Sequence, residues 1–353
     1  MEEILNLFPE ELKKTLAETG APTYRASQVF SWLHVKRVRS FSEMTDLPKA
    51  LRECLSERFV ITSLKPVTVQ KSNMDGTIKV LFECADGCRI ESVFMKYRYG
   101  ASICVSTQVG CRMGCRFCAS TIGGLERNLT AAEMLSEIYE MERLSGEDIR
   151  HLVLMGTGEP FDNYDEVIRF IRLAICPEGK NMSARNVTLS TSGIPDKIRA
   201  FASEGLPVTL ALSLHASNDA ERRELMPVAR KYALSEVLSA CDAYFHETGR
   251  RVTFEYAVIS GKNDTEKHVQ ELRQLLGKRS AHMNLIPVNP VREKLMKRPD
   301  RKEIAAFQNA LEIAGIHATI RRSLGNDIDG ACGQLRYSAA LSGIEDQKGE
   351  DRQ

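Results

Sequence analysis

The chain has 353 residues, and its 48 lysines and arginines nearly balance its 47 aspartates and glutamates. This balance excludes binding of a polyanion through overall basicity, so any nucleic-acid surface must be a local patch. Apolar residues make up 43% and charged residues 27%, as in an ordinary globular protein. Since no apolar run reaches membrane-helix length and the acidic N-terminus lacks a signal peptide's basic start, we expect a cytoplasmic protein without membrane contact.

Residues 1–60 predict a small helical domain. Pro9 opens one helix, and apolar residues recur at helical spacing over 25–32 and 51–59. From residue 61 to residue 100 the period changes to two, which indicates strands. The sequences Met-Asp-Gly and Asp-Gly within this stretch predict tight turns, so we expect a β-hairpin extension here.

Residues 101–341 alternate between apolar strands and amphipathic helices. Such repetition predicts a parallel sheet, here a partial (β/α)6 barrel in an α/β protein. Thr130 forms a capping box for the first helix, Asn163 is expected to cap the next, and 316–320 is a candidate for a further strand. The polar tail 342–353 is expected to be disordered. The six expected strands are 103–109, 151–156, 186–192, 207–215, 251–259 and 283–288.

Three cysteines, Cys111, Cys115 and Cys118, follow the first expected barrel strand in C-x3-C-x2-C spacing. Iron–sulfur clusters normally take four thiolates, so a loop with three leaves one iron with an open site. This pattern is typical of a 4Fe-4S cluster whose open iron binds S-adenosylmethionine (SAM). The alternative is a zinc site with a remote fourth ligand, although zinc favours paired C-x2-C elements.

The segment Met-Gly-Thr-Gly-Glu-Pro ends the second expected strand, where ligands bind in parallel β/α proteins. Gly158 lets the backbone approach a ligand closely, and the Glu159 carboxylate can accept hydrogen bonds from the SAM ammonium group. Alone, this segment could be an ordinary strand-to-loop turn. One β/α unit after a cluster motif, it becomes a candidate SAM-binding element.

Polar residues follow other expected strands on the same rim of the barrel. Each of them alone could be a loop cap, but together they predict a convergent binding site. The candidates are Ser190, Ser213, Leu214, His215 and Asn289.

Two of the ten cysteines lie outside the cluster motif and outside apparently helical or hairpin segments. Cys104 belongs to the first expected barrel strand. Cys332 lies in a Gly- and Asp-rich segment, where an accessible thiolate could react, although it could also be a buried thiol. A structural disulfide framework is not expected in a reducing compartment.

Seven strings in this order and spacing resemble the RlmN family of adenine-C2 methyltransferases that act on 23S rRNA and tRNA. The resemblance covers nearly the whole chain, including the helical N-terminal segment, and one departure is Thr157, where the family often has methionine. The strings are CVSTQVGCRMGCRFC, GGLERNLT, MGTGEP, LSTSG, SLHAS, NLIPVNP and DIDGACGQL.

The resemblance implies roles that the residues alone do not. Cys332 would carry a methyl group from a first SAM, and a second SAM would give the radical that activates this methyl group. Cys104 would then release the product through a transient disulfide with Cys332. Glu91 would accept the proton from the base. Without the resemblance, Glu91 reads as a solvated strand residue.

The resemblance also implies partners. These are 23S rRNA and tRNA, together with an electron donor such as flavodoxin or ferredoxin, and we expect a monomer. Given an RNA substrate, the helical domain becomes an RNA-binding accessory, with the basic run 36–39 and the segment 292–302 as candidate phosphate contacts. Two alternatives stay open: the sister Cfr family, which methylates adenine C8 and confers antibiotic resistance, and a non-catalytic zinc-bearing RNA-binding protein.

Overall fold

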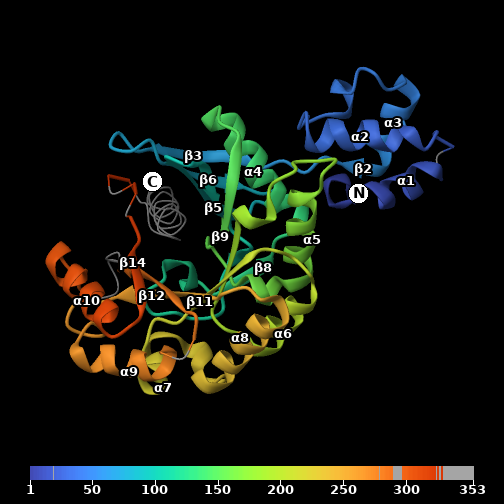
Figure 1. Ribbon diagram of the computed structural model, residues 1–353. Helices are drawn as coiled ribbons and strands as arrows, with labels where there is room; N and C mark the ends of the chain where they lie inside the picture. Colours follow the sequence, from blue (N-terminus) through green and yellow to red (C-terminus); the bar gives the residue numbers. More distant parts are fainter. Residues whose placement is uncertain (19, 278, 289–295, 323, 326, 329–353) are drawn as a thin grey trace.

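The computed structural model describes residues 1–18, 20–277, 279–288, 296–322, 324–325 and 327–328. A ten-stranded sheet curls into a partial barrel, helices cover its outer face, and a small helical unit lies beside α4 and α5 (Figure 1). The α/β class and the partial barrel predicted from the sequence are therefore confirmed. The polar tail 342–353 lies outside the described residues.

Seven neighbouring strands of the sheet are parallel, in the order β14-β13-β12-β11-β10-β9-β6. All six expected barrel strands are present, and the candidate strand at 316–320 is the seventh. Their bounds are β6 Gly100–Cys104, β9 Ile149–Leu154, β10 Val187–Thr191, β11 Thr209–Ser213, β12 Thr253–Val258, β13 His282–Pro287 and β14 His317–Ile320.

The first barrel strand was predicted wrongly at both ends. Strand β6 begins at Gly100 and ends at Cys104, and the chain then leaves the barrel because Thr107 and Gln108 donate their backbone N–H groups to the carbonyl of Thr157. The next residues form β7 (Gln108–Gly110), which pairs with β8 (Leu125–Asn128) in a separate two-stranded sheet. This small sheet frames the cysteine loop.

Three antiparallel strands extend the barrel beyond β6. They are β3 (Lys65–Lys71), β4 (Ile78–Glu83) and β5 (Arg89–Tyr97), joined by the two turns expected from the sequence. Since directly opposed residues of antiparallel strands point to the same face, register decides which side chains of this extension enter the barrel.

The outer helices follow the β/α alternation. Thr130 caps α4 in the predicted capping box with Glu133, but Asn163 does not cap α5: its side-chain amide donates 2.8 Å hydrogen bonds to the carbonyls of Thr107 and Leu129 instead. The helices are α4 Ala131–Ser145, α5 Tyr164–Ile175, α6 Pro195–Ser203, α7 Asp219–Leu225, α8 Leu234–Thr248, α9 Glu266–Leu276 and α10 Arg301–Ile313. Single 3-10 turns occupy Ile4–Asn6, Phe41–Glu43, Ala119–Thr121, Pro160–Asn163, Ala184–Asn186 and Pro227–Arg230.

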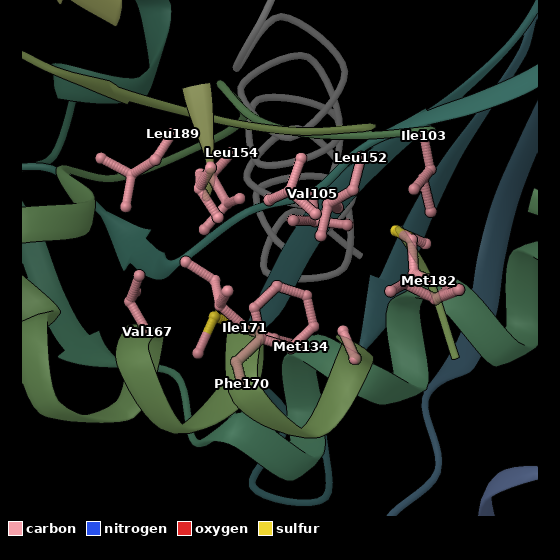
Figure 2. Packing of buried hydrophobic residues seen from close by; sticks show 14 of the residues in the cluster. Ile103, Val105, Met134, Leu152, Leu154, Val167, Phe170, Ile171, Met182 and Leu189 are labelled. Carbon is pink, nitrogen blue, oxygen red and sulfur yellow. The ribbon is translucent and has the colours of Figure 1, made fainter. Parts of the chain in front are cut away.

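The main core lies between the sheet and these helices. Ile103, Leu152 and Leu189 point from three neighbouring strands toward Met134 of α4 and Phe170 of α5 (Figure 2). All five side chains are fully buried. Because each buried side chain of this size contributes about 1.5–3 kcal/mol, packing on the apolar outer face of the sheet stabilises the barrel.

The N-terminal unit contains α1 (Pro9–Ala17), α2 (Tyr24–His34), α3 (Lys49–Arg58) and the parallel pair β1 (Glu2–Glu3) and β2 (Phe59–Val60). No helix among the described residues is long and apolar enough to cross a membrane.

Two arginines of the basic run 36–39 attach the N-terminal unit to the barrel. Arg37 pairs with Glu142 at 2.6 Å, and Arg39 pairs with Glu140, both acidic partners being on α4. These two guanidinium groups therefore already have partners inside the protein. The RNA-binding role of residues 1–60, like the other domain assignments, stays a prediction.

Candidate active site

A cavity of about 330 Å³ opens inside the barrel toward the carboxyl ends of the parallel strands. Five of the residues expected around SAM line it, as do all three cysteines of the motif. These residues are Gly158, Glu159, Ser190, Ser213 and His215, with Cys111, Cys115 and Cys118. The structure thus brings these segments together around one cavity.

The cysteine loop lies against the small β7–β8 sheet. The backbone N–H of Cys111 donates to the carbonyl of Gly124 at 2.9 Å, which fixes the loop where it begins. Burial raises the pKa of the Cys111 thiol to about 12 and also raises that of Cys115, and the charges of the three sulfurs act on one another. Buried thiols of this kind ionise readily only when a metal compensates their charge.

The three thiols fit a cluster that binds each of them to a different iron. Among the described residues, no three His, Cys, Asp or Glu side chains are gathered closely enough to hold a single metal ion. A cluster does not require that arrangement, because its irons, not one central ion, receive the thiolates. Phe117 packs edge-on against the His215 ring at a centroid distance of 4.6 Å and lines the cavity beside the loop.

Two glycines let the strand-to-loop turn after β9 lie directly on the backbone after β6. A Cβ at Gly156 would come within 2.5 Å of the carbonyl oxygen of Val105. A Cβ at Gly158 would come within 2.7 Å of both the Thr107 hydroxyl and the Gln108 side chain, and its φ of +113° also disfavours other residues. The close approach expected of this segment is therefore made first of all to the protein's own backbone.

Glu159 is buried and ties the ends of β9 and β10 together. One carboxylate oxygen accepts hydrogen bonds from Phe161 N and the Thr191 hydroxyl, and the other accepts from Ser192 N at 2.7 Å. Burial nevertheless raises its pKa above the ordinary value. A carboxylate offers about four acceptor positions, so three protein donors leave room for one donor from a ligand in the cavity.

The polar rim is assembled from β10 and β11. The hydroxyls of Ser190 and Ser213 lie 3.4 Å apart, and both side chains face the cavity. The Leu214 side chain, in contrast, is fully buried in the main core, so this residue can meet a ligand only through its backbone. Asn289 lies outside the described residues.

His215 holds a conformation that is unusual for a residue with a side chain. Its φ is +58°, which costs energy in a residue that has a Cβ. Its Nδ1 accepts a 2.9 Å hydrogen bond from Ala257 N, so the proton of the neutral ring is on Nε2. Burial, together with the charge of Arg222, lowers its pKa to about 3. The imidazole is therefore neutral over the physiological range.

Glu91 and Cys104 lie on the paired strands β5 and β6, where the antiparallel extension joins the parallel strands. Glu91 is 4% exposed and pairs at 3.0 Å with Lys79, which is completely buried, so the expectation of a solvated strand residue was wrong. Val93 opposes Cys104 across β5 and β6 and also lines the cavity, which places Glu91 and Cys104 on the inner face. Cys332 lies outside the described residues.

Three charged residues near the cavity were missed from the sequence. Lys79 and Glu255 are charged residues within the largely apolar strands β4 and β12, which was an available signal for both. Arg222, on the short polar helix α7, is fully buried and donates to the carbonyls of Ser192, Ser213 and Leu214. Arg222 thereby joins the ends of β10 and β11, and no pattern in the sequence around Arg222 predicts these contacts.

The comparisons with known proteins agree with this geometry. A family model described as the radical SAM superfamily matches residues 105–276, and one described as the ribosomal RNA large subunit methyltransferase N-terminal domain matches residues 2–61. A crystal structure of a radical SAM methyltransferase from Sphaerobacter thermophilus is 43% identical, with a TM-score of 0.90 over 95% of this chain and 99% of that one.

Curated relatives match at similar length. The probable dual-specificity RNA methyltransferase RlmN of Lachnoclostridium phytofermentans is 52% identical over 95% of this chain and 94% of its own. A relative of the same description from Halalkalibacterium halodurans is 50% identical over 94% and 92%. The chain therefore belongs to the RlmN family of radical SAM methyltransferases, and its cofactors are a 4Fe-4S cluster and SAM.

Proposed function

We propose that this enzyme methylates C2 of a specific adenine in 23S rRNA and of an anticodon-adjacent adenine in tRNA. The observation that supports this most is that one cavity brings together the cysteine motif and the Gly158–Glu159 turn, while Glu91 and Cys104 share the barrel's inner face. Family membership supplies the RNA substrate class, because the relatives are named as RNA methyltransferases.

A radical route suits this carbon. Adenine C2 is an electron-poor amidine carbon without a usable lone pair, so it does not attack the SAM methyl group. Cys111, Cys115 and Cys118 would hold the cluster, which would supply the electron for cleavage of SAM to an adenosyl radical. Around SAM we assign contacts to Gly158, Glu159, Ser190, Ser213, Leu214, His215 and Asn289.

Cys332 would act as the methyl carrier. Its thiolate forms a bond to the methyl carbon of one SAM as the carbon–sulfonium bond breaks. After a hydrogen atom is removed from this methyl group, the carbon forms a bond to C2 of the base. Glu91 would accept the C2 proton, and the oxidised cluster would take back one electron, which restores the aromatic ring.

Cys104 would then release the product. Its thiolate attacks the sulfur of Cys332, the bond between that sulfur and the new carbon breaks, and the carbon takes a proton to become the methyl group. The two cysteines are left as a disulfide, which an external dithiol reduces before the next turnover. The position of Cys104 on the inner face supports this role.

We further propose that the enzyme works as a monomer in the cytoplasm, with a flavodoxin or ferredoxin as electron donor. C2 is favoured over C8 by the relatives, which carry the RlmN description.

Nucleoside analysis tests this proposal. Reconstituted enzyme, SAM and reductant are incubated with a 23S rRNA fragment or a tRNA, and the digest is compared with both methyladenosine standards by mass spectrometry. We expect 2-methyladenosine from both RNAs. Appearance of 8-methyladenosine would assign the chain to the sister activity, and absence of any methyladenosine with an intact cluster would refute the proposal.

A further inference from the structure

Glu255 is a buried carboxylate inside the barrel that the proposed reaction does not yet use. It lies on β12, is 3% exposed and lines the cavity. One carboxylate oxygen accepts a 3.0 Å hydrogen bond from the Asn284 side-chain amide of β13. The other, Oε2, is buried and has no hydrogen-bond partner among the described residues.

An unpartnered buried oxygen of this kind requires an explanation, because leaving a buried charged acceptor unsatisfied is costly. Burial raises the pKa of Glu255, opposed by the charge of Arg321 and by the Asn284 hydrogen bond. The side chain thus stays in an unfavourable environment inside the cavity. A ligand with a hydroxyl or amino donor would relieve this cost.

The neighbours of Glu255 indicate which donor. Ser213 opposes Glu255 directly across β11 and β12, and Ser190 follows at 3.4 Å from Ser213. These three side chains form a continuous row of oxygens on one wall of the cavity. A pair of adjacent hydroxyls is complementary to such a row, since each hydroxyl can donate to a different oxygen, as acidic residues do with ribose in nucleotide-binding folds.

We propose that Glu255 accepts a hydrogen bond from a ribose hydroxyl of an adenosine bound in the cavity. This inference rests on the proposed function, in which both SAM and the target nucleotide are adenosines. Ser213, at the adjacent register position, receives the second hydroxyl. Glu255 is then a binding residue that orients the nucleoside, while Asn284 holds its carboxylate in place.

Binding measurements test the contact without requiring catalysis. Calorimetry on cluster-loaded enzyme compares S-adenosylhomocysteine with its 2'-deoxy and 3'-deoxy counterparts. A hydrogen bond to a charged acceptor predicts at least a tenfold loss of affinity when the correct hydroxyl is removed. In Glu255→Gln the parent ligand weakens by a similar factor, and the deoxy ligand loses little more.

Glu137→Gln is the matched control. Glu137 on α4 is also fully buried and also has one unpartnered oxygen, but its carboxylate bonds Ser92 and Ser106 on the outer face of the sheet. It should leave both affinities unchanged. Thermal unfolding of both variants shows whether the fold is kept, and in the wild type the three ligands show by themselves whether a ribose hydroxyl contributes to binding.

A second arm distinguishes the two adenosines. If the contact belongs to the RNA, S-adenosylhomocysteine binds Glu255→Gln normally, and replacing the target adenosine by 2'-deoxyadenosine weakens RNA binding in the wild type alone. If neither deoxy substitution affects wild-type binding, the inference is wrong. Failure of the proposed function would instead appear as absence of methyladenosine while these binding differences persist.

Discussion

Two parts of the barrel interior differ in how their functional residues are arranged along the sequence. The parallel wall follows the carboxyl ends of β9 to β13, and the antiparallel wall is formed by β4, β5 and β6. On the parallel wall, the cysteine loop and the Gly158–Glu159 turn are short segments whose residue types and spacing, taken together, indicate what they can bind. On the antiparallel wall, Lys79, Glu91 and Cys104 come from three strands and meet only through register. A one-residue slip there would turn each side chain to the other face.

This difference separates two tasks in one cavity. The parallel wall offers thiols and backbone groups of the kind that hold cofactors throughout β/α barrels. The antiparallel wall offers the buried Lys79–Glu91 ion pair and the Cys104 thiol, which suit proton and sulfur chemistry on a substrate. Loss of a cluster cysteine should therefore abolish every step, whereas loss of Cys104 should stop the reaction after it has begun.

The largest effect is expected for the cysteine loop. Replacing Cys111, Cys115 or Cys118 by alanine removes a thiolate that the cluster needs, so iron and sulfide content and SAM cleavage should fall to background. Anaerobic purification followed by iron and sulfide analysis measures this, with Cys241→Ala, a core cysteine of α8, as the control. A triple variant that kept about four irons per chain would contradict the assignment.

Substitutions of Cys332 and Cys104 should stop the reaction at different stages. Cys332→Ala should keep the cluster and lose all methyl transfer, because no carrier is present. Cys104→Ala should begin the reaction and stop as a protein–RNA adduct visible on denaturing gels, since no thiolate is left to attack the bridging sulfur. Normal turnover by Cys104→Ala without adduct would remove the disulfide step from the mechanism.

The buried ion pair of the second wall should matter for stability as well. Lys79→Met leaves the Glu91 carboxylate without its cation, and breaking a buried pair in this way costs about 3–5 kcal/mol of unfolding free energy. Chemical denaturation measures the loss. Lys96→Met on β5, whose partner Glu147 is exposed, should cost less than about 1 kcal/mol. Equal losses for the two lysines would show that burial of the pair is unimportant.

The same contrast explains which parts of the fold and of the site can be predicted from the sequence. The strands, the Thr130 capping box and the cysteine loop depend on neighbours within a few residues, so pattern and spacing identify them. Burial of Glu91 depends on Lys79, twelve residues earlier and across a hairpin, and burial of Arg222 depends on carbonyls from other strand ends. Such pairings form only once the sheet has formed, and sequence patterns within a few residues do not predict them.

The end of the first barrel strand was predicted wrongly for a related reason. Residues 105–109 have the apolar, β-branched character of a strand, but Thr107 and Gln108 turn away to bond the carbonyl of Thr157. The Gly156 and Gly158 positions make that approach possible. Tertiary contacts therefore override a local strand preference at the point where the cavity begins.

Gly158→Ala should have an intermediate effect. The new Cβ meets the Thr107 hydroxyl and the Gln108 side chain at 2.7 Å and is strained at a φ of +113°, so we expect a loss of about 2–4 kcal/mol and weaker SAM binding. Gly123→Ala is the matched control, since its φ is +91° but nothing lies within 4 Å. It should lose only about 1 kcal/mol. Equal losses would mean that backbone strain at Gly158, and not contact with Thr107 and Gln108, determines the effect.

The smallest effect is expected where the β3–β4 turn meets the segment after β14. Asp75 accepts hydrogen bonds from Thr77 N at 3.0 Å and from Gly325 N at 2.9 Å, and Asp327 accepts from the Ser72 hydroxyl and Asn73 N. Burial alone would raise the pKa of Asp75, but the hydrogen bonds from Thr77, Gly325 and Ser72 outweigh it and lower the pKa below its ordinary value.

Because the folded pKa of Asp75 is depressed, its contribution to stability is present above the unfolded value near 4 and is lost as pH falls through the folded value. Asp75→Asn should therefore cost about 0.5–1.5 kcal/mol at pH 7 and nothing near pH 2. Urea unfolding at both pH values measures the difference. Asp196→Asn, at a carboxylate that is 86% exposed, should show no such dependence. A loss in Asp75→Asn that is equal at both pH values would show that ionised Asp75 does not hold the two segments together.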